Sequence, residues 1–132
     1  MELRYRQGDY LYHGSPYKFD VVRVRQAVDV MFEEGCQNAV YASESIDMAI
    51  CFALGVEGSA DGERIMMPDD GMKMRFVNCH PRYDKKGYIY VLNKSSFVHV
   101  MGTQWVSHED QEPVDILEIS VNDYIDSHCI IE

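Results

Sequence analysis

Short apolar runs, each closed by glycine, proline or acidic residues, dominate the pattern of this sequence. They are rich in aromatic and β-branched residues, which is typical of strands, and they are too short for most helices. Strands are expected at residues 10–13, 39–42, 74–77, 87–92, 97–100, 103–107 and 114–120. A helical period occurs at residues 45–54, where Ile46, Ala49, Ile50 and Ala53 would line one face. One helix among many short strands predicts an α+β fold with mainly antiparallel sheet.

The expected helix has signals at both ends. Ser43 or Ser45 is placed to cap its first turn, and Gly55 is placed to end it. The small alanines predict close packing of this helix against a sheet. Phe52 falls away from the apolar stripe, so we expect it to face a cleft or a neighbouring loop.

The segments between these elements have weaker patterns. Residues 17–24 are either a strand or an extended connection in which Phe19 and Val21 are buried, and residues 28–32 are a short apolar patch. Residues 55–73 are predicted to be a loop with at most a short strand at 64–67, because glycine and acidic residues are frequent there. Residues from 122 onward are expected to be a brief tail.

A net charge of −10 limits the partners of the chain. Such a surface repels phosphate backbones and anionic lipid, so general nucleic-acid binding and membrane binding are not expected. Arg82, Lys85 and Lys86 form a local basic cluster, which is either a solvated turn or a contact for a pyrophosphate group. The length of 132 residues predicts one domain over 1–132.

The cysteines and histidines do not follow metal-ligand spacing. No two cysteines lie at CxxC spacing in the sequence, which contains Cys36, Cys51, Cys79 and Cys129. We therefore expect reduced thiols, no metal and a cytoplasmic protein. The N-terminal residues lack the apolar segment of a signal peptide, and no apolar run approaches the ~20 residues needed to span a membrane. The histidines expected to be structural or exposed are His80, His99, His108 and His128.

The stretch Tyr12-His13-Gly14-Ser15-Pro16 places a histidine where a strand meets a turn. An imidazole offers both a donor and an acceptor near neutral pH, and a glycine allows close approach of backbone to a ligand. Such a histidine is either structural or part of a site.

A second motif follows at Val40-Tyr41-Ala42-Ser43, and the helix after it contains Ala49-Ile50-Cys51-Phe52-Ala53. Together with the first motif, this pattern resembles the ADP-ribosyltransferase-like superfamily, in its His-Tyr-Glu branch of diphtheria toxin and poly(ADP-ribose) polymerases. It looks most like small bacterial and phage members and rifampin ADP-ribosyltransferases. The resemblance covers about residues 10–120. It implies a compact fold of two mainly antiparallel small sheets, with one principal helix after the second-motif strand.

The resemblance also implies NAD as the substrate. His13 would hold the nicotinamide ribose, the backbone of Gly14 would bond the amide, and Tyr41 would stack on the nicotinamide ring. Ser15, Ser43 and Phe52 would complete the NAD-binding set. Three of these residues have other interpretations, because Tyr41 is also placed to be a sheet aromatic in the core, Ser43 to cap the helix and Phe52 to lie in a core.

The third motif departs from the family, because Gln104-Trp105-Val106 carries glutamine where the family has a catalytic glutamate. A neutral amide keeps hydrogen bonding but loses the charge that stabilises an oxocarbenium-like transition state, and the loss of one such interaction costs ~10²–10³ in rate. The nearby carboxylates, expected to be surface charges or substitutes, are Glu109, Glu112 and Glu118.

Three interpretations remain open at this point. The first is a mono-ADP-ribosyltransferase, a glycosyltransferase that uses His13, Tyr41 and Gln104 and passes ADP-ribose from NAD to an unknown acceptor. The second is a catalytically inactive module on the same fold that binds a nucleotide or a protein partner. The third is an unrelated small α+β domain.

Overall fold

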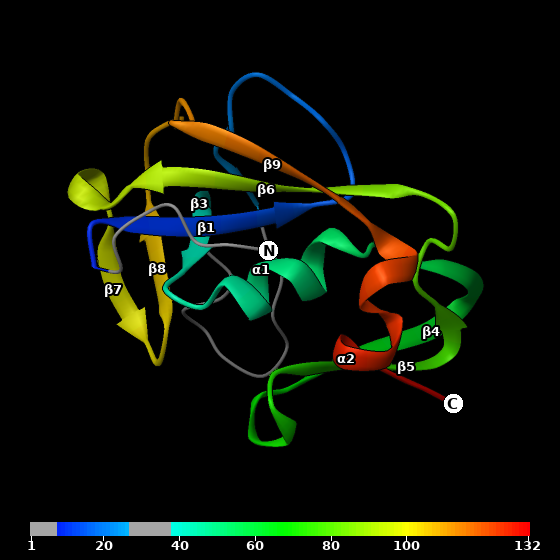
Figure 1. Cartoon of the computed structure of the whole chain (residues 1–132). Helices are drawn as coiled ribbons and strands as arrows, with labels where there is room; N and C mark the ends of the chain where they lie inside the picture. The colour runs from blue at the N-terminus through cyan, green and yellow to red at the C-terminus, as the bar shows by residue number, and fades with distance from the viewer. Residues whose placement is uncertain (1–7, 27–37) are drawn as a thin grey trace. The chain divides into compact units, whose positions relative to one another are not determined.

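A computed structural model describes residues 8–26 and 38–132 (Figure 1). The strands are β1 (Tyr10–Ser15), β2 (Arg25–Gln26), β3 (Asn38–Ser43), β4 (Glu57–Met67), β5 (Lys73–His80), β6 (Lys86–Asn93), β7 (Val98–Met101), β8 (Gln104–Ser107), β9 (Asp115–Ser120) and β10 (Cys129–Ile131). The helices are α1 (Ile46–Ala53) and the short α2 (Ile125–His128), with 3₁₀ turns at Pro68–Asp70, Lys94–Ser96 and Val121–Tyr124.

The strands form two sheets. One has the order β7-β8-β3-β1-β6-β9, with β2 also paired to β3, and the other has the order β10-β5-β4. β3 pairs antiparallel with β1, β2 and β8, and β4 pairs antiparallel with β5. β10 is parallel to β5. The expected α+β class with mostly antiparallel sheets is therefore confirmed at this level.

The chain divides into two compact units. The first comprises the described parts of Met1–His13, Phe19–Ser45 and Tyr90–Ile116. The second comprises Gly14–Lys18, Ile46–Ile89 and Leu117–Glu132. Three of the five boundaries between the units fall inside the strands β1, β6 and β9.

In the second unit, α1 packs closely against neighbouring strand backbone. A Cβ at Gly14 of β1 would overlap the carbonyl oxygen of Ala49, and one at Gly87 of β6 would overlap that of Ala53. Glycine on the strands and alanine on the helix together permit this approach. The prediction of close packing from the alanines is confirmed, and Gly55 ends the helix in the left-handed region with φ +67°.

A sulfur-rich core lies in the second unit. Cys51, Met74, Phe76 and Cys79 are buried, and Cys129 packs against them. Burial raises the pKa of the Cys51 thiol to about 12 and that of Cys129 to about 11. Both thiols are therefore protonated near neutral pH.

The prediction of a loop is wrong for residues 57–67, which form the long strand β4, and the short strand expected at 64–67 is the end of β4. Most β4 side chains are exposed, so the segment lacks the apolar alternation that marks a half-buried strand. Pairing with β5 supplies the structure instead, and the register shifts between Gly58 and Glu63. A Cβ on Gly62 would crowd the side chain of Cys79, which explains a glycine inside this strand.

Two further expectations need correction. Of the two alternatives for residues 17–24, the structure has a connection and not a regular strand, and Val22 makes an isolated bridge to Gln111. Val22 is buried, whereas Phe19 and Val21 are only half-buried. The C-terminal tail is ordered into α2 and β10 because β5 provides a pairing edge. The apolar patch at residues 28–32 lies outside the described residues.

The other expected elements are confirmed with small changes of boundary. β1, β5 and β6 extend beyond the predicted strands, and α1 begins one residue later than predicted. β6 is the most buried of the predicted strands, in agreement with its apolar sequence. In the described ranges, no helix is both long and apolar enough to cross a membrane.

Candidate functional site

The three motif strands are hydrogen-bonded neighbours in the first unit. β3, which carries Tyr41, pairs with β1 on one side and with β8 on the other. Ser43 lies opposite Tyr12 of β1 and opposite Gln104 of β8. Segments far apart in the sequence therefore bring His13, Tyr41 and Gln104 onto three adjacent strands.

The imidazole of His13 is fixed by the backbone of the tyrosine strand. Nδ1 of His13 lies 2.6 Å from the carbonyl oxygen of Tyr41. A carbonyl oxygen only accepts hydrogen bonds, so Nδ1 carries the proton and donates it. When the ring is neutral, this contact selects the tautomer in which Nε2 is an acceptor.

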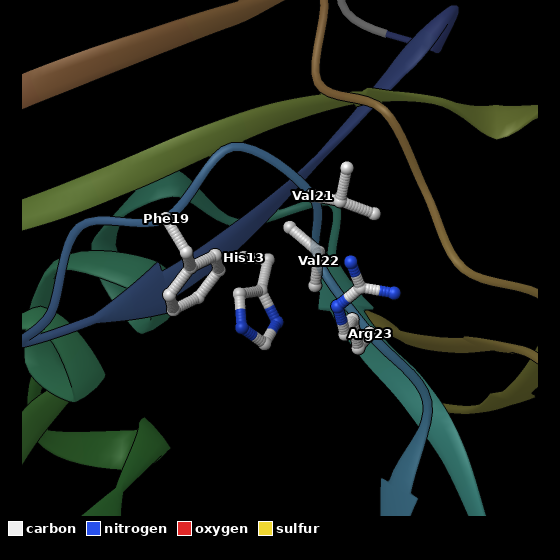
Figure 2. Close-up of a pocket in the computed structure, with 5 residues that line it drawn as sticks. All are labelled: His13, Phe19, Val21, Val22 and Arg23. Atoms are coloured by element: carbon white, nitrogen blue, oxygen red, sulfur yellow. The ribbon is translucent and has the colours of Figure 1, made fainter.

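A hollow of about 200 Å³ lies beside His13 (Figure 2). Among the described residues it is lined by His13, Phe19, Val21, Val22 and Arg23. In Figure 2, Phe19 lies on one side of the His13 ring and Arg23 on the other. A cavity of ~150 Å³ can hold benzene, whereas sites that enclose drug-sized ligands measure ~300–1,000 Å³. The hollow therefore has room for one flat ring but not for a whole dinucleotide.

Tyr90 supports one wall of the hollow. Its ring stacks on Phe19 with centroids 4.5 Å apart and planes 1° apart. The backbone N–H of Phe19 also donates to the Tyr90 hydroxyl over 2.9 Å. Because Tyr90 is fully buried, the position of Phe19 is tied to the core of the unit.

The opposite wall is held by the connection between β8 and β9. The backbones of Val22 and Gln111 exchange two hydrogen bonds of 2.9 and 2.8 Å. The buried side-chain amide of Gln111 donates to the hydroxyls of Ser96 and Ser107 over 2.7 and 2.9 Å. The segment that lines the hollow is irregular, yet its backbone is fixed at both walls.

Arg23 places a positive charge at this mostly apolar hollow. Its Nη1 lies 3.3 Å from Oδ2 of Asp110, and the two side chains are 74% and 47% exposed. Oδ1 of the same carboxylate accepts from the backbone N–H of Val24 over 2.8 Å. An ion pair this exposed contributes about 0–1 kcal/mol, so it is readily exchanged.

Tyr41, Ser43 and Gln104 share one face of the β3–β8 pair because strand side chains alternate and Ser43 pairs with Gln104. The described residues that line the hollow do not include Tyr41 or Gln104. Tyr12, and not His13, is the residue opposite Ser43, so the side chain of His13 starts from the other face of β1. The structure thus joins His13 to the backbone of Tyr41 rather than gathering all these side chains in one hollow.

The backbone at Gln104 is anchored by the preceding residue. The hydroxyl of Ser43 donates to Oγ1 of Thr103 over 2.9 Å and accepts from the N–H of Ser45 over 2.9 Å. The N–H of Glu44 donates to the Thr103 carbonyl over 2.9 Å. Ser43 therefore stabilises the turn into α1 and the start of β8, which is a structural use of its hydroxyl.

Several predicted site residues lie in the second unit. Gly14 packs on Ala49, which accounts for the missing side chain, and the buried hydroxyl of Ser15 accepts from the N–H of Tyr17 over 3.1 Å. Phe52 is 39% exposed on α1. These contacts give Gly14 and Ser15 structural roles. A ligand role for Gly14, Ser15 or Phe52 stays a prediction.

The basic cluster and the acidic substitutes also have described surroundings. Arg82 donates to the Pro16 carbonyl over 3.0 Å and lies 5.0 Å from the centroid of the Tyr17 ring. Lys86 donates to the Ser120 hydroxyl over 2.9 Å. Arg82 therefore braces the turn after β1. The side chains of Glu109, Glu112 and Glu118 are exposed.

The lining of the hollow beyond His13 has no distinct signal in the sequence. Phe19, Val22 and Arg23 lie in a stretch without a clear period, and their support comes from the distant residues Tyr90 and Gln111. An arginine close in sequence to the apolar Phe19 and Val22 is a common pattern. It indicates a site only once the contacts with Tyr90 and Gln111 are known.

The described residues contain no group of three or more His, Cys, Asp or Glu side chains placed to hold a metal ion. No protein-family model matches the chain, and no curated protein and no solved structure is significantly similar to it.

Proposed function

We propose that this protein binds NAD and transfers a single ADP-ribose group to an acceptor with release of nicotinamide. The observation that supports this proposal is the adjacency of β1, β3 and β8, with the imidazole of His13 held by the Tyr41 carbonyl. The resemblance of the motifs on these strands to the His-Tyr-Glu branch supplies the choice of NAD.

In the proposed reaction, the bond between the nicotinamide nitrogen and C1 of its ribose breaks, and nicotinamide leaves with the electron pair. An acceptor nucleophile then forms a bond to C1 and loses its proton to solvent or to a base. His13 would bond a ribose hydroxyl, Tyr41 would offer its flat face to nicotinamide, and Gln104 would orient the ribose. Most of the rate gain would come from holding the reacting groups in place.

Calorimetry with NAD tests the binding step. Wild-type protein is expected to bind NAD, and His13→Ala is expected to abolish the signal. His108→Ala removes an exposed imidazole from the same unit and is the matched control, which should bind like wild type. Failure of the folded wild-type protein both to bind NAD and to release nicotinamide would disprove the proposal.

A catalytically inactive module is the second candidate, and Gln104 is the observation that favours it. If the domain is a weakened enzyme, Gln104→Glu restores a negative charge at the ribose and should raise nicotinamide release by ~10²-fold. If NAD binds but turnover stays at background in both proteins, the module is the correct alternative.

A further inference from the structure

We infer that the hollow beside His13 is a nucleoside-phosphate subsite, with the flat base against Phe19 and Val21 and a phosphate on Arg23. The inference rests on the proposed function for the identity of the ligand, since NAD contains an adenosine diphosphate half. It assigns roles to Phe19, Val21 and Arg23, which the sequence motifs leave without one.

The lining has the chemistry of such a subsite. Phe19 and Val21, which are half-buried, provide apolar surface, and a base that stacks on an aromatic ring gains dispersion and loses contact with water. His13 adds a polar edge between them (Figure 2). The volume of about 200 Å³ suits one ring system, so the remaining parts of a dinucleotide would extend outside it.

The hollow beside His13 is separate from the side chains of Tyr41 and Gln104, which start from the other face of the sheet. The resemblance assigns these two side chains to nicotinamide and its ribose, and neither is among the described residues that line the hollow. We assign the nucleoside phosphate to the hollow on the chemistry of its lining, and the Tyr41 carbonyl fixes the imidazole of His13 beside it.

Arg23 has the features expected of a phosphate contact. Its guanidinium is largely exposed, and its contact with Asp110 joins one nitrogen to one oxygen. A phosphate offers a guanidinium two parallel hydrogen bonds, which are stronger than this single contact. A ligand phosphate would therefore displace the Asp110 carboxylate, and Asp110 would act as a competitor for Arg23.

This exchange makes two opposite predictions that calorimetry with ADP can test. Arg23→Gln should weaken ADP binding by about tenfold or more, because it removes the cation. Asp110→Asn should strengthen binding severalfold, since it removes the competing charge while its amide oxygen can still accept from Val24 N–H. Arg75→Gln is the matched control: Arg75 also pairs with an exposed carboxylate, Glu132, but does not line the hollow.

NAD titrated on the same proteins separates this inference from the proposed function. NAD binding that is lost in His13→Ala but unchanged in Arg23→Gln would overturn the phosphate assignment and leave the proposed function standing. ADP binding that depends on Arg23, with no nicotinamide release and no NAD binding, would support the subsite and disprove the transferase. No ADP binding by folded wild-type protein would overturn the subsite. Equal losses in Arg23→Gln and Arg75→Gln would also overturn it, since net charge alone would then explain the result.

Discussion

At the scale of single residues, Gly14 shows how one motif position can serve packing. In the sequence it stands beside His13 and is interpreted as a place where backbone approaches a ligand. In the structure, the space that its side chain would fill holds the Ala49 carbonyl of α1. Packing alone is thus sufficient to require glycine there, whatever the backbone of Gly14 binds.

Gly14→Ala should therefore destabilise the protein by about 3 kcal/mol, because the obstructing atoms are helix backbone and cannot rotate away. Gly71→Ala is a useful comparison, since its Cβ would meet no atom within 4 Å but its φ is +79°. We expect about 1 kcal/mol for that strain alone. Urea unfolding of the three proteins measures both effects, and a Gly14→Ala cost no larger than that of Gly71→Ala would show that α1 can move aside.

At the scale of elements, the arrangement of the site depends on how β3 is joined to α1 and β8. The hydroxyl of Ser43 links the turn before α1 to Thr103, the residue that precedes Gln104. A serine expected to cap the helix thus stabilises the β3–β8 pair at the candidate site. The residue that stabilises the turn into the helix is therefore also one that holds β3 and β8 together beside Gln104.

A double-mutant cycle measures this link. Ser43→Ala should cost about 1–3 kcal/mol because it removes a buried partner from both Thr103 and the Ser45 N–H, and Thr103→Val should cost about 1 kcal/mol. The double variant should cost less than the sum of the two single variants. When both hydroxyls are removed, neither is left buried without its hydrogen-bond partner. Strict additivity in denaturant unfolding would mean that the two hydroxyls do not interact.

At the scale of the whole molecule, buried thiols couple global stability to alkaline pH. Cys51 and Cys129 belong to one core, and burial holds both pKa values above the ordinary 9.0. A raised folded-state pKa means that the native state keeps protons that the unfolded chain releases. This contribution to stability is complete below pH 9 and is lost as the pH rises toward 11 and 12.

We expect the free energy of unfolding to fall by about 2–4 kcal/mol between pH 9 and pH 12 through the shifted thiols. Cys51→Ala should be less stable at neutral pH, because it removes a buried sulfur, but should have a shallower decline above pH 9. Denaturant unfolding at several pH values gives both slopes under reducing conditions. Parallel curves for the two proteins would show that Cys51 does not titrate in this range.

Local sequence patterns were sufficient to predict most strands and the helix α1. The short apolar runs of β1, β3, β6, β8 and β9 and the helical period of α1 are local signals, because they depend only on residues close in the sequence. The motifs around His13, Tyr41 and Gln104 follow from the same short range. Their placement on three neighbouring strands depends instead on the pairing of β3 with β1 and β8.

Long-range packing was needed for the rest. β4 is a strand because β5 pairs with it, although its own residues resemble a loop. The hollow exists because Tyr90 and Gln111 fix an irregular segment that has no period of its own. Hydrogen bonds and ring stacking between distant residues leave no regular spacing in a sequence, so these features follow from tertiary contacts, whereas periodic burial follows from the order of the residues.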